Sequence, residues 1–120
     1  MEIYRFDQGV CRTVHKYDSN FLMTKLLVTE GITHIGCMYI EPGEVVGYHQ
    51  ATVDQLFIVV HGEGVVRTTE EDRTVIQKGQ AAFWKQEEWH ETKATTSMVV
   101  IVTEAENMRP EHFLQLVSES

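Results

Sequence analysis

The sequence predicts an all-β fold, an antiparallel sandwich or barrel with one short helix near the C-terminus. Short apolar stretches alternate with polar residues along most of the chain. Turns containing Gly or Pro separate these stretches at regular intervals, which is typical of sandwiches and barrels. Only the last stretch has helical spacing. With 120 residues, we expect one domain over residues 1–120, long enough to bury about two thirds of its unfolded surface.

The first third of the chain is expected to hold three strands, at residues 2–6, 21–28 and 33–41. Between the first two, residues 7–20 are polar and rich in turn formers, so we expect no strand there. The third strand ends at the turn Pro42-Gly43. Side chains alternate along a strand, so Tyr39 shares a face with Ile35 and Cys37, while Met38 points the other way.

The remaining strands follow two stretches with similar organisation, residues 43–64 and 79–94. Each begins with Gly, passes through a short strand and a polar turn, and leads into a second strand. Expected strands are a short one carrying His49, then 55–60, 65–69, 73–77, 81–84, 90–94 and 98–103.

The tail changes character at Pro110, which suits the first turn of a helix. Glu111 suits the positive N-terminal end of that helix. Phe113, Leu114 and Val117 follow at helical spacing. We therefore expect a short helix packed on the outside of the strands.

Composition and charge exclude several classes of function. The formal net charge is −8, and the ten basic residues are scattered singly, which argues against nucleic acid as a partner. No apolar run is long enough to cross a membrane. The N-terminus has no secretion signal, so we expect a cytoplasmic protein. Cys11 and Cys37 lack CxxC spacing and are expected to be reduced thiols.

The two stretches resemble the two motifs of the cupin family. In the first motif, Gly43, His49 and Gly62 are in register, while Ala51 and Gln55 stand at its second histidine and its glutamate. In the second motif, Gly79 and His90 are in register, and Lys85, Glu87 and Ala94 replace its Pro, Gly and Asn. The resemblance implies a jelly-roll β-barrel.

If Gln55 occupies the glutamate position of the motif, its face of the strand points into the barrel. Alternation then places His49 and His90 inward as well, on two other strands. We expect His49, Gln55 and His90 to converge on one site near the barrel mouth, a common place for ligands. Phe57 and Trp84 are expected to form pocket walls, together with Tyr39.

Two imidazoles can bind a divalent transition metal such as Zn, Ni, Fe or Mn, here with His49, Gln55 and His90 as its ligands. Gln55 supplies only a neutral donor and Ala51 supplies none, which weakens such a site. The alternative is that the two histidines are polar pocket residues hydrogen-bonded to Gln55 or water, since a glutamine amide both donates and accepts.

The function expected from these residues is the binding of a small organic molecule in the barrel, with or without a divalent metal. The alternative is a metal-dependent cupin enzyme, such as a dioxygenase or an isomerase. The sequence identifies no catalytic residue. A purely structural or interaction protein is a third reading, against which both in-register histidines argue.

A homodimer is also expected. The stretches 55–60 and 98–102 are apolar on both faces, and only one face of each fills the barrel. The C-terminal helix is expected to cover part of the other face and a second subunit the rest, because large exposed apolar patches usually mark partner sites.

Overall fold

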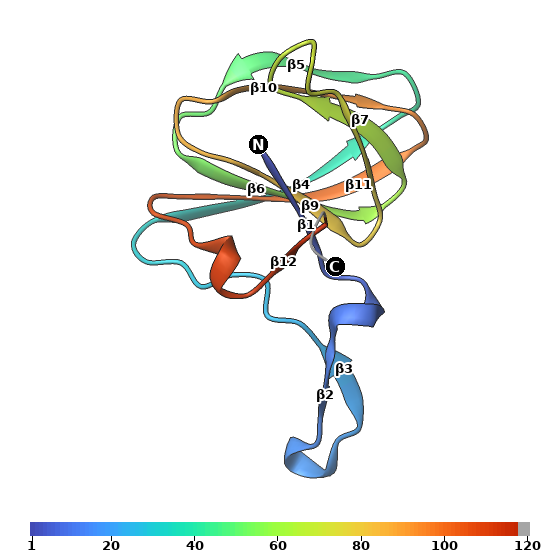
Figure 1. The fold of residues 1–120 in the computed structure, drawn as a ribbon, viewed down its shortest axis with the longest axis vertical. Coiled ribbons are helices and arrows are strands. Elements are labelled where there is room, and N and C mark those ends of the chain that lie inside the picture. Colours follow the sequence, from blue (N-terminus) through green and yellow to red (C-terminus); the bar gives the residue numbers. More distant parts are fainter. Residues whose placement is uncertain (118–120) are drawn as a thin grey trace.

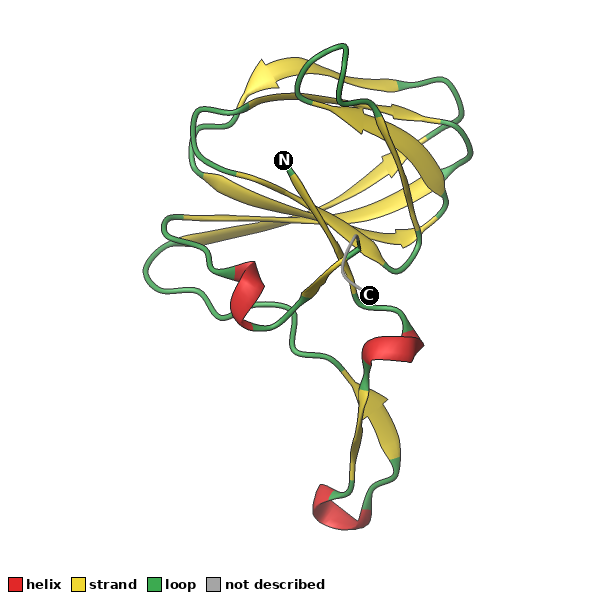
Figure 2. Cartoon of the chain, in the orientation of Figure 1, coloured by secondary structure: helices red, strands yellow, loops and turns green. Residues whose placement is uncertain are grey.

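The structure is a computed structural model that describes residues 1–117. Its main body is two antiparallel sheets that face each other (Figures 1 and 2). The larger sheet has six strands in the order β12-β1-β9-β6-β11-β4, and the smaller has four in the order β5-β10-β7-β8. The jelly-roll fold class predicted from the sequence is confirmed.

The strands have the following bounds. They are β1 Glu2–Arg5, β2 Arg12–Val14, β3 Phe21–Met23, β4 Thr33–Ile40, β5 Val45–Gln50, β6 Asp54–His61, β7 Glu63–Arg67, β8 Thr74–Gln77, β9 Gln80–Trp84, β10 Trp89–Ala94, β11 Met98–Ala105 and β12 Gln115–Leu116. Helical structure in residues 1–117 is limited to three single 3-10 turns, η1 Gln8–Val10, η2 Lys16–Asp18 and η3 Pro110–His112. No helix in this part of the chain is long and apolar enough to cross a membrane.

The larger sheet buries apolar side chains on both of its faces. Along β6, Phe57 and Val59 point between the two sheets, where they pack with Val66 of β7. Leu56 and Ile58 point to the outer face of the sheet and belong to a second apolar cluster. Period-two alternation separates the two sets, and burial on both faces explains why this strand is an almost continuous apolar run.

The C-terminal tail covers much of the outer face, but mostly without helix. Met108 and Leu114 pack there against Tyr4. The expected short helix is confirmed only as the single turn Pro110–His112. After it the chain turns back to extended structure and β12 pairs with β1, with Leu116 opposite Tyr4. The helical spacing of Phe113, Leu114 and Val117 therefore does not correspond to a longer helix, because the free edge of β1 offers backbone partners instead.

The segment before β4 differs most from the expectation. The turn-rich residues 7–20 contain β2, and the strand expected at 21–28 is only Phe21–Met23. These two strands pair with each other as a separate two-stranded sheet, which projects away from the main body (Figure 1). Beyond β3 the chain is irregular, and Leu26 and Leu27 pack on the outer cluster.

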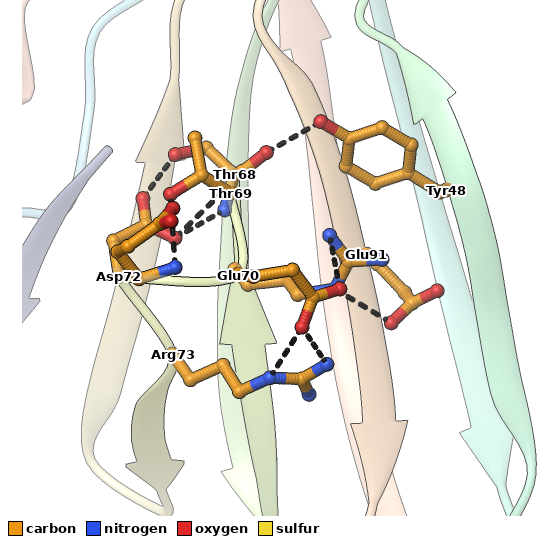
Figure 3. Close-up of polar contacts among 9 residues, drawn as sticks. Tyr48, Thr68, Thr69, Glu70, Asp72, Arg73 and Glu91 are labelled. Carbon is orange, nitrogen blue, oxygen red and sulfur yellow. Dashed lines mark hydrogen bonds and ion pairs between the residues drawn. The ribbon is translucent and has the colours of Figure 1, made fainter.

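Polar contacts fasten the turn between β7 and β8 (Figure 3). The Asp72 carboxylate accepts hydrogen bonds from the backbone N–H groups of Thr68 and Thr69 at 2.8 Å each, and another from the Thr68 hydroxyl. Tyr48 of β5 donates its hydroxyl proton to the Thr68 carbonyl. Arg67 of β7 pairs with Glu91 of β10, with 3.0 Å between guanidinium nitrogen and carboxylate oxygen. The contacts join three strands of the smaller sheet at its outer face.

Candidate functional site

His49 and His90 meet because their strands pair in register. β5 and β10 are antiparallel neighbours, and His49 lies directly opposite His90. The two imidazole centroids are 4.4 Å apart, in an edge-to-face arrangement with 61° between the ring planes. A register shift follows immediately, between His90 and Thr92. The structure therefore brings together the two histidines that the motif spacing singled out.

The two imidazoles differ in exposure, but in both of them Nδ1 faces a backbone carbonyl. His90 is 2% exposed, whereas His49 reaches solvent. The Nδ1 of His49 lies 2.6 Å from the Gly47 carbonyl, and that of His90 lies 3.4 Å from the Glu88 carbonyl. A carbonyl oxygen only accepts, so both rings carry their proton on Nδ1 and keep a free lone pair on Nε2.

Burial keeps His90 neutral. Loss of solvent, followed by the nearby His49, lowers the pKa of His90 to about 4, although the Glu88 carbonyl and carboxylate act in the opposite direction. A cationic imidazole is poorly solvated in an apolar interior, which is the physical basis of the shift. At neutral pH His90 therefore presents an acceptor at Nε2.

Gln55 lies on β6 in the larger sheet, on the inner face that it shares with Phe57, whereas the two histidines belong to the smaller sheet opposite. It is 9% exposed and sits opposite Trp84 across the β6–β9 pair. Its side-chain amide hydrogen-bonds to no group within residues 1–117, including the two imidazoles. His49 and His90 therefore contact each other directly. Gln55 is connected to them only through its neighbour Trp84, on which His90 stacks.

Trp84 connects the parts of the site. Its indole stacks on His90 with 4.2 Å between ring centroids and 14° between the planes, and it contacts Phe57 edge-to-face at 5.4 Å. Within residues 1–117 its Nε1–H is the one fully buried side-chain polar atom without a hydrogen-bond partner. Sequence reasoning named Trp84 and Phe57 as walls, but it missed this donor, because alternation gives the face of a ring and not the direction of its N–H.

Tyr39 does not line the site, and its assignment as a pocket wall is wrong. Its side chain is 75% exposed. It pairs with Val99 of β11, whereas the neighbouring Met38 pairs with Val100, a member of the inner cluster. Alternation therefore directs Tyr39 to the outer face of the larger sheet.

The residues present do not fit the four-donor metal site that the motif resemblance implies. Ala51 is buried and offers only a methyl group where the motif has histidine. Gln55 offers a neutral amide in place of a carboxylate. Across residues 1–117, no group of three or more His, Cys, Asp or Glu side chains is arranged to hold a metal ion. Two imidazoles and one amide are what remains.

Two cavities lie elsewhere on the molecule. One of about 540 Å³ lies between the base of the projecting hairpin and the tail, with Arg12, Lys25 and His112 in its lining. A second, of about 620 Å³, lies beside Gln8, Val60 and Lys78. Neither is lined by His49, His90 or Gln55.

Comparison with solved structures supports the same fold. The chain is similar to a cupin superfamily protein from Desulfitobacterium hafniense, with 13% identity, 71% of this chain and 77% of that one covered, and a TM-score of 0.59. It is similar to an RmlC-like cupin protein from Desulfovibrio desulfuricans, with 21% identity, coverage of 84% and 87%, and a TM-score of 0.57. A third similar structure is a predicted oxalate decarboxylase from Thermotoga maritima, with 24% identity, coverage of 59% and 64%, and a TM-score of 0.52.

No curated protein matches the chain. The sequence model of the cupin domain matches residues 36–104, which is more than half of the 120 residues and includes every strand from β5 to β10. The resemblance seen in the two motifs is confirmed, and the chain belongs to the cupin domain family.

Proposed function

We propose that this cupin domain binds a small, uncharged organic molecule at the inner face formed by His49, Gln55, Trp84 and His90. The observation that carries the proposal is the buried Trp84 Nε1–H without a partner. An unsatisfied buried donor costs about 1–3 kcal/mol, and native proteins usually satisfy such groups with protein, water or ligand.

The donors and acceptors of the site define the ligand chemistry. Trp84 offers one donor, each imidazole offers an acceptor at Nε2, and the Gln55 amide offers both. Among residues 1–117 the buried polar side chains are Gln55, His90, Thr92 and Thr103, so no Lys or Arg is buried there to neutralise an anion. A compact heterocycle, amide or alcohol with both donors and acceptors suits this set, with its flat or apolar part against Phe57.

The second candidate is a metal-dependent enzyme, a dioxygenase or an isomerase. The orientation of the two imidazoles favours it, because backbone carbonyls hold both Nδ1–H groups and leave both Nε2 atoms free, as in many metal-ligating histidines. His49, Gln55 and His90 would then be the protein ligands. The absence of a carboxylate and the methyl of Ala51 weigh against it.

Native mass spectrometry, together with elemental analysis of untagged protein purified without chelators, tests the two candidates. The binding proposal predicts a retained small organic molecule that is lost in Gln55→Leu, a change that removes the amide but keeps the bulk. The matched control is Gln77→Leu, which alters an exposed glutamine of β8. A stoichiometric Fe, Mn, Ni or Zn without an organic ligand would instead favour the enzyme.

Fluorescence supplies an independent readout. The chain has two tryptophans, so Trp89→Phe leaves Trp84 as the sole indole, beside His90. Neutral lactams, amides and nitrogen heterocycles serve as probes, and the proposal predicts that some of them shift the Trp84 emission in a saturable way. If no probe changes it and the purified protein retains no organic molecule, the binding proposal is wrong.

A further inference from the structure

The projecting hairpin, residues 11–25, contains a two-stranded sheet that is separate from the two main sheets. We call this segment the arm. Within residues 1–117 its strands β2 and β3 pair only with each other and join neither main sheet (Figure 1). At its tip Tyr17 is 96% exposed, and Phe21, Leu22 and Met23 are each about half exposed. An isolated two-stranded hairpin is marginally stable in water, so the arm would be stabilised by packing against a further surface.

The longest free sheet edge among residues 1–117 is β4. It is the last strand of the larger sheet and pairs on one side only, with β11. Its outward face exposes Ile35 at 70% and Tyr39 at 75%. Its residues 33–40 contain neither Pro nor Lys, which commonly protect edge strands from pairing. The edge therefore offers unpaired backbone groups next to exposed apolar side chains.

Charge makes the arm and the body complementary. The arm contains three basic residues and one acidic residue, hence +2, and with a formal charge of −8 for the whole chain the remainder carries −10. Glu30 precedes β4, and Glu41 and Glu44 follow it, all of them exposed. Arg12 and Lys16 of the arm are exposed as well. A basic arm is therefore attracted to the acidic body of another copy of the same chain.

We propose that a second copy of this chain occupies the β4 edge and lays its arm along it. Strand addition of this kind satisfies the free backbone groups of an edge, while apolar side chains supply specificity. Two copies that exchange arms form a closed two-fold dimer. This dimer interface differs from the one expected from the sequence, because the tail of the same chain already covers Leu56 and Ile58 on the outer face of β6.

Light scattering at micromolar concentrations tests the proposal with four proteins. The wild type is expected at twice the mass of one chain. The arm variant Phe21→Asp/Leu22→Asp and the edge variant Ile35→Lys/Tyr39→Lys are each expected to raise the dissociation constant of the dimer by at least ~10-fold. Val75→Lys, a change at an exposed side chain of β8, is the matched control and should leave association unchanged. Circular dichroism melts verify that every variant is folded.

A mixing experiment distinguishes arm exchange from other dimers. In a mixture of arm variant and edge variant, the intact arm of one copy meets the intact edge of the other, so one of the two contacts is restored. The mixture should therefore associate more tightly than either variant alone. A monomeric wild type, a dimer that tolerates either double variant, or a mixture without recovery would each overturn the proposal.

Discussion

The His90 imidazole lies against the Trp84 indole, with the two ring planes only 14° from parallel and their centroids 4.2 Å apart. The two residues come from different sheets, β10 in the smaller and β9 in the larger. The stack therefore connects the sheets across the barrel interior, and it places a titratable group where water is scarce. The pH dependence of stability and the chemistry of the site both depend on it.

Acid should destabilise the fold through His90. Its pKa is about 4 in the folded chain against an ordinary 6.5, so unfolding takes up a proton, and stability falls as pH drops from 6.5 towards 4. His49 beside it reaches solvent, which moderates the effect, and we expect a loss of about 1–2 kcal/mol by pH 4.5. Urea unfolding at pH 7 and pH 4.5 measures it.

His90→Phe keeps an aromatic ring on Trp84 and removes the titration. The difference in unfolding free energy between the two pH values should shrink in this variant. His61→Gln, at an exposed position of β6, is the control and should retain the wild-type difference. If His90→Phe keeps the full difference, another group is responsible.

Gln55→Glu restores the carboxylate that the motif resemblance implies. Gln55 is mostly buried and opposite Trp84, and no cation among residues 1–117 is buried beside it. An unpaired charge there should cost about 1–3 kcal/mol in stability. Thermal melts with and without Fe(II), Ni(II) or Zn(II) measure the change, with Gln77→Glu as an exposed control. Binding of a neutral ligand predicts that none of these metals restores stability, whereas full recovery would favour the enzyme.

Much of the barrel could be predicted from the sequence because alternation is unambiguous where a strand has a fixed inner face. The strands from Thr33 to Ala105 lie within a few residues of their expected positions, and glycine turns separate them. The meeting of His49 and His90 followed from motif spacing combined with side-chain parity. These signals are local. They predict the structure correctly because the two sheets bury the apolar face of each strand between them.

The arm, the tail and Tyr39 depend on tertiary partners that a sequence does not specify. Arg12–Val14 is too short and polar to indicate a strand, and it becomes one by pairing with Phe21–Met23. The tail pairs with β1, a choice that local helical spacing cannot reveal. Side-chain alternation correctly predicted that Tyr39 and Met38 point to opposite faces of β4. Which of these faces is the inner one depends on how β4 is placed in the sheet, and alternation does not show that.

Glu87→Gly should stabilise the protein. Glu87 stands at the glycine position of the second motif and has a φ of 77°, in the left-handed region that glycine favours. Its backbone N–H donates to Ala51 and its carbonyl accepts from the Gln50 amide, and both bonds survive the change. Relief of left-handed strain exceeds the entropy cost of glycine by about 0.5–1 kcal/mol. Lys85→Gly, in the same turn but without a positive φ, should be destabilising; a loss in both variants would contradict the argument.

Gly62→Ala and Gly43→Ala should differ sharply, although both glycines belong to the first motif. Both have a positive φ, 86° and 83°. A Cβ at Gly62 would lie 2.0 Å from the Ser97 carbonyl oxygen and 2.9 Å from the Met98 Cα, whereas one at Gly43 would meet no atom within 4 Å. The obstructing atoms are backbone, so no rotamer change relieves the overlap.

Gly43→Ala should therefore cost only the conformational term of about 1 kcal/mol. Gly62→Ala must in addition displace the start of β11 at Met98, so it should lower the free energy of unfolding by more than ~3 kcal/mol. Urea unfolding at pH 7 compares the two variants under identical conditions. Equal losses would mean that Ser97 and Met98 move away freely, and that the close approach of β11 to the β6–β7 turn is not a constraint on this fold.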